Sequence, residues 1–347
     1  MARPKKVSMQ DIAQYLGISK NAVSLALSNR KGVSEELRQQ VLQAAEELGY
    51  DKHIGQDLTG KQEHSAVLIL VPERIMSYED NEHFLFYHDL IWGLEQKLRD
   101  QGFSAVIQRI SLQMEQSLFL PELTHSINFD RVILFGIVRE EYARLVQQKW
   151  SSLLMFDSFY RSVPGPAVTS ANVEGAYTAA QYLLDQCHRR IGFIGPVHLT
   201  TSHEERWFGF WKALSEQSVM VDESCCLLES KGFHHTEEEI RHFLDTCGHL
   251  PTAFLCGNDR IALLLMTELQ TRQIRVPEDI SVIGFDGLDM SASSEPPLTT
   301  MKVDKNGMCE AAARWLQMET GRKEAPPNMR WYVPVSLIAR SSVKTLV

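Results

Sequence analysis

The chain has 347 residues, enough for two or three domains of ordinary size. Hydrophobic residues make up 44% and charged residues 23% of the sequence, as in ordinary soluble globular proteins. There is no apolar run of about 18 residues, so we expect no membrane span. No apolar segment follows the basic start at residues 1–6, so we expect no secretory signal peptide and a cytoplasmic protein.

The charge is unevenly distributed along the chain. The formal net charge is −9, yet residues 1–31 contain six Lys and Arg residues and the single anion Asp11. This segment therefore carries +5 and the remainder −14. A basic head on an acidic body concentrates the attraction for phosphate at one end of the molecule.

Metal and cofactor chemistry have little support in the sequence. The six cysteines include no CxxC pair, and we interpret them as reduced core residues. His234, His235 and His242 lie close in sequence but lack the spacing of a known metal motif. We expect no metal site and no cofactor.

Residues 8–27 have the pattern of a helix-turn-helix. Ser8 and Asp11 can form a capping box, Gly17 can make the tight turn, and Ser19 can cap a second helix. Apolar residues recur at helical spacing on the inner faces, at Ile12, Ala13, Leu16, Ala22, Val23 and Ala26.

The outer face of the second helix carries polar donors. Lys20, Asn21 and Ser24 are the kinds of side chain that a recognition helix brings into the major groove of DNA. The alternative is an amphipathic helix pair that serves only for packing. A third helix is predicted after Ser34 and ends at Gly49, so residues 1–50 form a headpiece and the polar residues 51–63 a linker.

From residue 64 onward, apolar strands alternate with helices. This alternation is typical of parallel sheets covered on both faces, and the length predicts two doubly wound α/β subdomains with a cleft between them. The predicted strands are residues 66–71, 103–110, 131–135, 152–156, 190–194, 225–228, 252–256 and 280–285. The predicted helices include residues 84–100, 174–186, 203–217, 236–246 and 259–272. No sequence motif of a nucleotide-binding loop, kinase or serine hydrolase is present, so an enzyme has no residue-level support.

The chain resembles the lactose-repressor and galactose-repressor (LacI/GalR) family of bacterial transcription regulators. The matching blocks include Asp11-Ile12-Ala13, Gly17-Ile18-Ser19, Leu48-Gly49-Tyr50, Gly93-Leu94-Glu95, residues 187–195, residues 206–210, Asn258-Asp259, residues 276–286 and Pro297-Leu298-Thr299-Thr300. The resemblance implies a periplasmic-binding-protein-like body that forms a homodimer and a headpiece that binds a near-palindromic DNA operator. The absence of C-terminal heptads argues against a tetramer.

The resemblance implies roles for residues of the headpiece and linker. Lys20 and Asn21 match base-reading positions, whereas Ala22 suits packing or a thymine methyl group. Leu25 stands where the family often has an arginine that reads guanine, so we expect a half-site without that guanine dependence. Phosphate contacts or caps are expected from Ser8, Ser19, Ser24 and Ser28.

The linker departs from the family's hinge helix. Leu58 is the candidate that would wedge into the minor groove, but Gly55 weakens a helix there by about 1 kcal/mol. The alternative for Leu58 is a solvent-exposed linker residue.

The resemblance also implies an effector site in the body. Arg206 and Asp259 match positions that hold the effector, and their chemistry suits a polyol. The candidate site residues are Phe86, Tyr87, Asp157, Arg206, Phe233, Asp259 and Asp286. Core packing is the alternative for the aromatic residues, and a structural ion pair is the alternative for Arg206 and Asp259. The pair Ala171-Asn172 replaces the family's common Asp-Asn, so the effector cannot be inferred from relatives.

The family implies subdomain boundaries and a function. We expect an N-subdomain of residues 64–164 and 292–324 and a C-subdomain of residues 165–291 and 325–347. The leading hypothesis is a repressor controlled by a small molecule, such as a sugar. The alternatives are a solute-binding or transport component with the same body, which the basic headpiece opposes, and an enzyme on an α/β scaffold.

Overall fold

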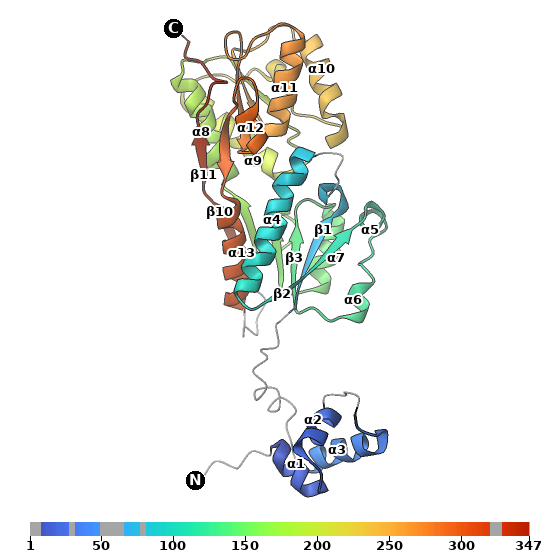
Figure 1. Cartoon of the computed structure of the whole chain (residues 1–347). Coiled ribbons are helices and arrows are strands. Elements are labelled where there is room, and N and C mark those ends of the chain that lie inside the picture. Colours follow the sequence, from blue (N-terminus) through green and yellow to red (C-terminus); the bar gives the residue numbers. More distant parts are fainter. Residues whose placement is uncertain (1–7, 28–31, 49–65, 77–80, 320–327, 347) are drawn as a thin grey trace. The chain divides into compact units, whose positions relative to one another are not determined.

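The computed structural model describes residues 8–27, 32–48, 66–76, 81–319 and 328–346. The chain divides after His64 into two compact units, a headpiece and a body (Figure 1). Ser28 and Leu58 lie outside the described residues.

The headpiece contains three helices. They are α1 (Met9–Leu16), α2 (Lys20–Leu27) and α3 (Glu35–Glu47). The Ser8 and Asp11 side chains form the predicted capping box, and Gly17 ends α1 in the left-handed conformation with φ 65°. A small apolar core joins all three helices, with Ile12, Ala13, Val23, Ala26, Val41, Ala44 and Ala45 buried.

The first sheet of the body has six parallel strands in the order β10-β5-β4-β3-β1-β2. Its strands are β1 (Ala66–Pro72), β2 (Ser104–Ile110), β3 (Arg131–Phe135), β4 (Leu153–Phe156), β5 (Ala167–Ser170) and β10 (Arg330–Val333). The associated helices are η1 (Glu73–Met76), α4 (Asn81–Asp100), α5 (Leu112–Ser117), α6 (Leu123–Ser126), α7 (Glu140–Lys149) and α13 (Lys305–Glu319). Figure 1 shows α4 and α13 side by side.

Successive residues of β1 point to opposite faces of this sheet, and both faces are covered. Val67 and Ile69 face the core that contains residues of α4 and α13. Leu68 and Leu70 face the core that contains residues of α7. A strand buried on both sides has no polar alternation, which accounts for its continuous apolar sequence.

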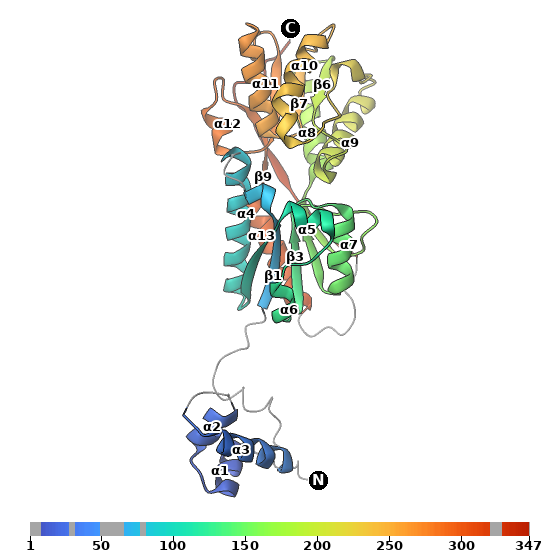
Figure 2. The same cartoon turned by 90° about the vertical axis from the view of Figure 1, so that its right-hand side faces the viewer.

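The second sheet has the order β11-β9-β8-β7-β6, with only β11 antiparallel to its neighbour. Its strands are β6 (Ile191–Ile194), β7 (Ala253–Cys256), β8 (Ser281–Asp286), β9 (Thr299–Val303) and β11 (Val335–Ile338). The helices are α8 (Asn172–Asp185), α9 (Thr201–Glu216), η2 (Glu223–Cys225), η3 (Phe233–His235), α10 (Thr236–Thr246), α11 (Asp259–Thr271) and α12 (Asp289–Ser293). Figure 2 shows this lobe above the lobe of the first sheet.

Three very short connections join the two lobes. Ala171 alone separates β5 of the first sheet from α8, Asp304 separates β9 from α13, and Pro334 separates β10 from β11. Short parallel connections of this kind suit a hinge between two rigid lobes.

The structure corrects the predicted subdomain boundaries. Residues 167–170 and 330–333 pair in the first sheet, whereas residues 299–303 pair in the second. The prediction had placed each of these segments in the other subdomain. Local sequence shows that a segment is a strand, but hydrogen bonds to distant strands decide which sheet it joins.

The predicted strand at residues 225–228 was also wrong. Cys225 ends the short helix η2. Leu227 and Leu228 then run beside β6 and the residues after it, with an isolated bridge between Leu227 and Ile194 and three backbone hydrogen bonds, but they form no regular strand. Four apolar residues allow either conformation, and here Asp222 caps η2 by accepting the backbone N–H of Ser224.

The close contact between α8 and α9 depends on a glycine. A Cβ atom at Gly209 would lie 2.1 Å from the backbone oxygen of Val173. We expect Gly209→Ala to lower the free energy of unfolding of the body by about 1–3 kcal/mol, measured by chemical denaturation. Gly248→Ala is the matched control because nothing lies within 4 Å of its added Cβ. Equal losses in both variants would show that the helix contact is not tight.

Candidate functional site

The exposed part of α2 presents the predicted DNA-reading face of the headpiece. Lys20 and Asn21 are exposed at the start of this helix, and Ser24 and Leu25 are half-buried. Val23 is completely buried and packs in the headpiece core. The polar residues predicted to read bases therefore lie on the solvent side of a helix whose other side is held by packing.

Two of the predicted phosphate-contacting serines serve as helix caps. Ser8 accepts a hydrogen bond from the Asp11 backbone N–H at 3.4 Å and donates its hydroxyl to the Asp11 carboxylate at 2.6 Å. Ser19 Oγ accepts from the Ala22 backbone N–H at 3.1 Å. These bonds satisfy backbone groups at the helix starts and so orient α1 and α2.

In the body, the carboxyl ends of the two sheets bring four predicted side chains together. Asp157 directly follows β4 of the first sheet, and Asp286 ends β8 of the second. Arg206 comes from α9 and Tyr87 from α4. Asp157 and Tyr87 are both within the electrostatic influence of Asp286 and Arg206. Ligands of open α/β sheets bind at such strand ends.

Both aspartates at the strand ends, Asp157 and Asp286, have strained backbone conformations. Asp157 has φ 62° and Asp286 has φ 115°, in the left-handed region that L-residues avoid. Each such conformation costs about 1–3 kcal/mol and persists only where the surrounding fold enforces it. Strain of this kind is concentrated at ligand sites in proteins.

Arg206 is held in one orientation by four neighbours. Its Nε donates to Asn172 Oδ1 at 2.9 Å, and its Nη1 donates to the carbonyl oxygen of Gly257 at 2.5 Å. Its Nη2 lies 3.1 Å from Asp286 Oδ1. The guanidinium carbon lies 3.7 Å from the centre of the Phe285 ring. The side chain is thus buried, charged and preorganised, with Asp286 as its ionic partner.

The carboxylate of Asp259 is hydrogen-bonded within the body. Its carboxylate accepts the Leu288 backbone N–H at 2.7 Å and the Thr300 hydroxyl at 2.5 Å, and the residue has no exposed surface. Asp259 therefore supports the loop after Asp286, and burial together with the Asp286 charge raises its pKa to about 7. The contact of Asp259 with the effector stays a prediction, because a carboxylate can accept more than these two hydrogen bonds.

Burial shifts the ionisation of Asp157 and Tyr87. Burial, followed by repulsion from Asp286, raises the pKa of Asp157 to about 7, although Arg206 opposes the shift. Burial and the charges of Asp157 and Asp286 also raise the pKa of Tyr87. The Tyr87 hydroxyl consequently keeps its proton at neutral pH.

Phe86 and Phe233, which were predicted to line the effector site, are not among the residues described around Asp157 and Asp286. Phe86 is only 5% exposed and packs in the main core, with the Lys305 ammonium 5.4 Å from its ring centre. Core packing was the stated alternative for this residue. Phe233 lies in η3, but its side chain is outside the described residues.

Sequence reasoning missed Asn172 as a site residue. Asn172 is 2% exposed, accepts the Ser170 hydroxyl at 3.0 Å and donates to Glu205 at 3.0 Å, in addition to holding Arg206. In the sequence it was only the second member of an Ala-Asn pair after the crossover. Its position just past the end of β5, where polar residues commonly face a ligand, was the available signal.

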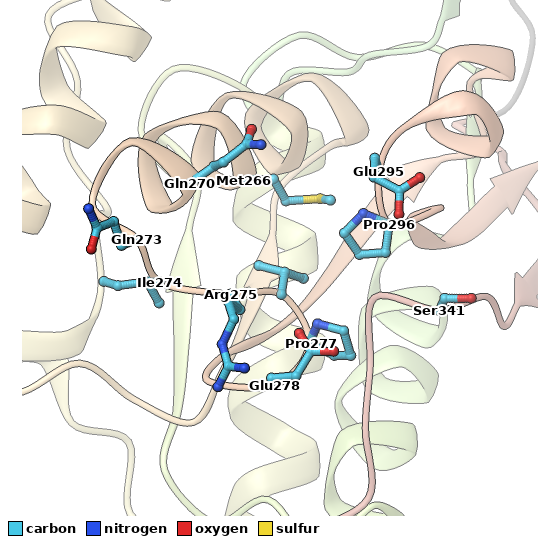
Figure 3. A pocket seen from close by; sticks show the side chains of 11 residues that line it. Met266, Gln270, Gln273, Ile274, Arg275, Pro277, Glu278, Glu295, Pro296 and Ser341 are labelled. Carbon is cyan, nitrogen blue, oxygen red and sulfur yellow. The ribbon is translucent and has the colours of Figure 1, made fainter.

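A cavity of about 590 Å³ lies elsewhere on the body (Figure 3). It is lined by residues of α11 and of three later segments, including Met266, Gln270, Arg275, Glu278, Glu295, Pro296 and Ser341. None of its lining residues belongs to the cluster around Arg206. The cavity is therefore separate from the candidate site at the strand ends.

Comparison with known proteins agrees with this architecture. Residues 8–52 match the model of the bacterial regulatory proteins of the lacI family, and residues 180–343 match that of a periplasmic binding protein-like domain. The chain is a member of the lacI family. It is accordingly a DNA-binding regulator of transcription and not an enzyme.

Relatives and solved structures match most of the chain. The HTH-type transcriptional repressor CytR of Escherichia coli strain K12 is 29% identical over 297 residues, which is 85% of this chain and 84% of CytR. The structure of the lac repressor dimer bound to operator and the anti-inducer ONPF covers 98% of this chain and 100% of that chain, with a TM-score of 0.69 and 22% identity. The complex of the regulator CelR with cellobiose has the same TM-score, 23% identity, and covers 97% of this chain and 100% of that chain. At these identities the two structures establish the shared fold.

Other classes of site have no support in the described part of the chain. There, no helix is long and apolar enough to cross a membrane. No group of three or more His, Cys, Asp or Glu side chains among the described residues could hold a metal ion.

The raised pKa of Asp157 predicts how the stability of the protein depends on pH. Because the pKa of Asp157 is about 7 in the folded protein and 3.8 for an ordinary Asp, the folded protein keeps a proton that the unfolded chain loses between these values. Stability attributable to Asp157 is therefore lost as the pH rises from about 4 to about 7. We expect Asp157→Asn to gain about 1–3 kcal/mol relative to the native protein between pH 5 and pH 8, measured by chemical denaturation.

Asp130→Asn is the matched control for this prediction because Asp130 is exposed on a loop. It should keep the pH dependence of the native protein. An unchanged pH dependence in Asp157→Asn would contradict the electrostatic account of the site.

Proposed function

We propose that this lacI-family member is a sequence-specific repressor that acts in the cytoplasm as a homodimer and is controlled by a polar small molecule, such as a sugar. The observation that carries the proposal is the presence in one chain of two preorganised sites. One is the exposed face of α2 on a capped helix-turn-helix, and the other is the Arg206–Asp286 cluster at facing strand ends.

Lys20 and Asn21 are the proposed base-reading residues. A Lys can donate to guanine, and an Asn can pair with adenine through two hydrogen bonds. Leu25 lies half-buried on the same helix and has no donor, so it contributes only apolar contact. Ser24 and Ala22 are proposed to contact the backbone or a thymine methyl group. Ser28 and Leu58, outside the described residues, remain sequence-based candidates for phosphate and minor-groove contacts.

The proposed effector binds between Asp157 of the first lobe and Arg206 and Asp286 of the second. A carboxylate that accepts hydroxyl protons and a guanidinium that donates are suited to a polyol. Tyr87 supplies a neutral hydroxyl at the same place. The cellobiose bound to CelR is a sugar of this chemistry. A ligand that contacts both lobes changes their relative pose through the three single-residue connections.

The proposed dimer surface is an exposed apolar stripe on α4. Leu85 is 51% exposed and Trp92 is 54% exposed, two turns apart, with exposed His88 between them. The His88 ring packs edge-on against Trp92 at 6.2 Å. Large exposed apolar residues that line one helix face are typical of protein interfaces. The lac repressor, which has the same fold, binds its operator as a dimer.

The DNA proposal can be tested with an operator selected from random duplexes by the full-length protein at fixed salt. Lys20→Ala and Asn21→Ala should each lose about 1–3 kcal/mol of operator affinity and relax the sequence preference, because base contacts specify. Lys149→Ala, which removes an exposed cation from α7 of the body, should bind like the native protein. The position that faces Leu25 should tolerate bases other than guanine.

Two results would contradict this proposal. The first is failure of the protein to select any sequence in a salt-sensitive manner. The second is a strict guanine requirement that disappears in Leu25→Ala.

The dimer proposal is tested by charge substitution on α4. Trp92→Glu places a charge in the apolar stripe and should shift the protein from dimer to monomer in sedimentation velocity, with a loss of operator affinity. Trp211→Glu is the control, since Trp211 is 51% exposed on α9, away from the stripe. A dimer that survives Trp92→Glu unchanged would exclude this surface.

A further inference from the structure

Two cysteines from different elements of the second lobe meet at one backbone oxygen. The Cys225 thiol at the end of η2 donates to the carbonyl oxygen of His249 at 3.2 Å. The Cys247 thiol, directly after α10, donates to the same oxygen at 3.6 Å. The distance between the two sulfur atoms therefore cannot exceed the sum of these two contacts. Because a short helix and α10 separate the two residues in the chain, the fold brings the thiols together.

A second contact places Cys247 against the backbone of η2. Its sulfur also lies 3.7 Å from the carbonyl oxygen of Ser224, the residue that precedes Cys225. A cysteine has a single side-chain torsion between its backbone and its sulfur. The two sulfurs can thus approach each other by rotation about the two Cα–Cβ bonds, as a disulfide requires.

The two thiols differ in how easily a soluble oxidant reaches them. Cys247 is half-buried, whereas Cys225 is only 3% exposed. Burial, followed by the charge of Asp222, raises the pKa of Cys225 to about 11. Because the thiolate is the reactive form of cysteine, Cys225 does not react first. Cys247 is the thiol that meets the oxidant.

We infer that Cys225 and Cys247 form a modification site, in which a hydroperoxide converts the two thiols to an intramolecular disulfide that a thiol reductant reopens. Disulfides of intracellular proteins are mostly transient, redox-sensing bonds of this kind. The site goes beyond the proposed function and does not depend on it, because neither cysteine belongs to the cluster around Arg206.

The oxidation takes two steps. The Cys247 thiolate sulfur attacks one oxygen of the peroxide, the O–O bond breaks, and the leaving hydroxide takes up the thiol proton as water, which leaves a sulfenic acid. The Cys225 sulfur then attacks the Cys247 sulfur, and the S–O bond breaks. Asp222 Oδ2, 3.5 Å from the Cys225 sulfur, accepts the Cys225 proton and the leaving hydroxide becomes the second water. The thiol pair loses two electrons and hydrogen peroxide gains them.

Two other cysteines serve as controls. The sulfur of the neighbouring Cys226 accepts the Phe193 backbone N–H at 3.4 Å and contacts the backbone oxygen of Asp222 at 3.5 Å, so it is engaged beside β6. Cys187 is exposed after α8 and tests whether accessibility alone directs the reaction.

The test exposes the reduced full-length protein to an excess of hydrogen peroxide. Remaining thiols are blocked with N-ethylmaleimide, and the linkage is mapped by mass spectrometry of peptides prepared without reductant. We expect most of the protein to yield a peptide pair joined through Cys225 and Cys247. Treatment with dithiothreitol before blocking should remove this pair and return both cysteines as blocked thiols.

Matched serine variants assign the linkage to these residues. Cys247→Ser and Cys225→Ser should each abolish it, whereas Cys226→Ser and Cys187→Ser should retain it. Because Cys247 is half-buried, Cys247→Ser keeps the test decisive if Cys225→Ser fails to fold, and circular dichroism establishes which variants are folded.

Three results would overturn the inference. The first is a folded native protein that forms no link between Cys225 and Cys247 after prolonged exposure to peroxide. The second is a link that joins either residue to a different cysteine in its place. The third is oxidation of Cys247 that proceeds to the sulfinic acid without a link, since Cys225 then fails to resolve the sulfenic acid.

Discussion

A buried guanidinium must be neutralised and hydrogen-bonded, and the arrangement of the body around Arg206 follows from this requirement. Asp286 provides the charge, Asn172 and the Gly257 carbonyl accept the remaining directed hydrogen bonds, and the Phe285 ring covers one face of the guanidinium. These partners come from β8, from the start of α8 and from the loop after β7, so one side chain of α9 ties several strand ends together. Loss of any partner would leave a buried donor or charge unsatisfied, which is more costly than loss of an exposed contact.

The same cluster places the candidate effector site at the junction of the lobes. Asp157 belongs to the first lobe and the Arg206–Asp286 pair to the second, and single-residue connections join the lobes. A ligand bound to both sides is coupled to the lobe pose because it has different contacts in different poses. The described cavity on α11 lacks this property, since its lining residues follow β7 in the chain and none belongs to the cluster.

Much of the fold could be predicted because its signals are local. The capping box of Ser8 and Asp11 and the turn at Gly17 depend on residues a few positions apart, and continuous apolar strands indicate a sheet covered on both faces. The prediction of a strand at residues 225–228 was wrong because a short apolar run is compatible with more than one conformation. The prediction of the sheet that residues 299–303 and residues 330–333 join was wrong, because hydrogen bonds between distant strands decide it.

The sequence by itself determined the helix-turn-helix, the family resemblance and the residue types of the candidate effector site. Only the tertiary structure decided how those residues are used. It paired Arg206 with Asp286, turned Asp259 toward Thr300 and Leu288, placed Phe86 in the core, and left Asp157 without a donor among the described residues. The reason is that a carboxylate's role depends on its burial and on the donors within hydrogen-bond distance, and both are set by segments far apart in the chain.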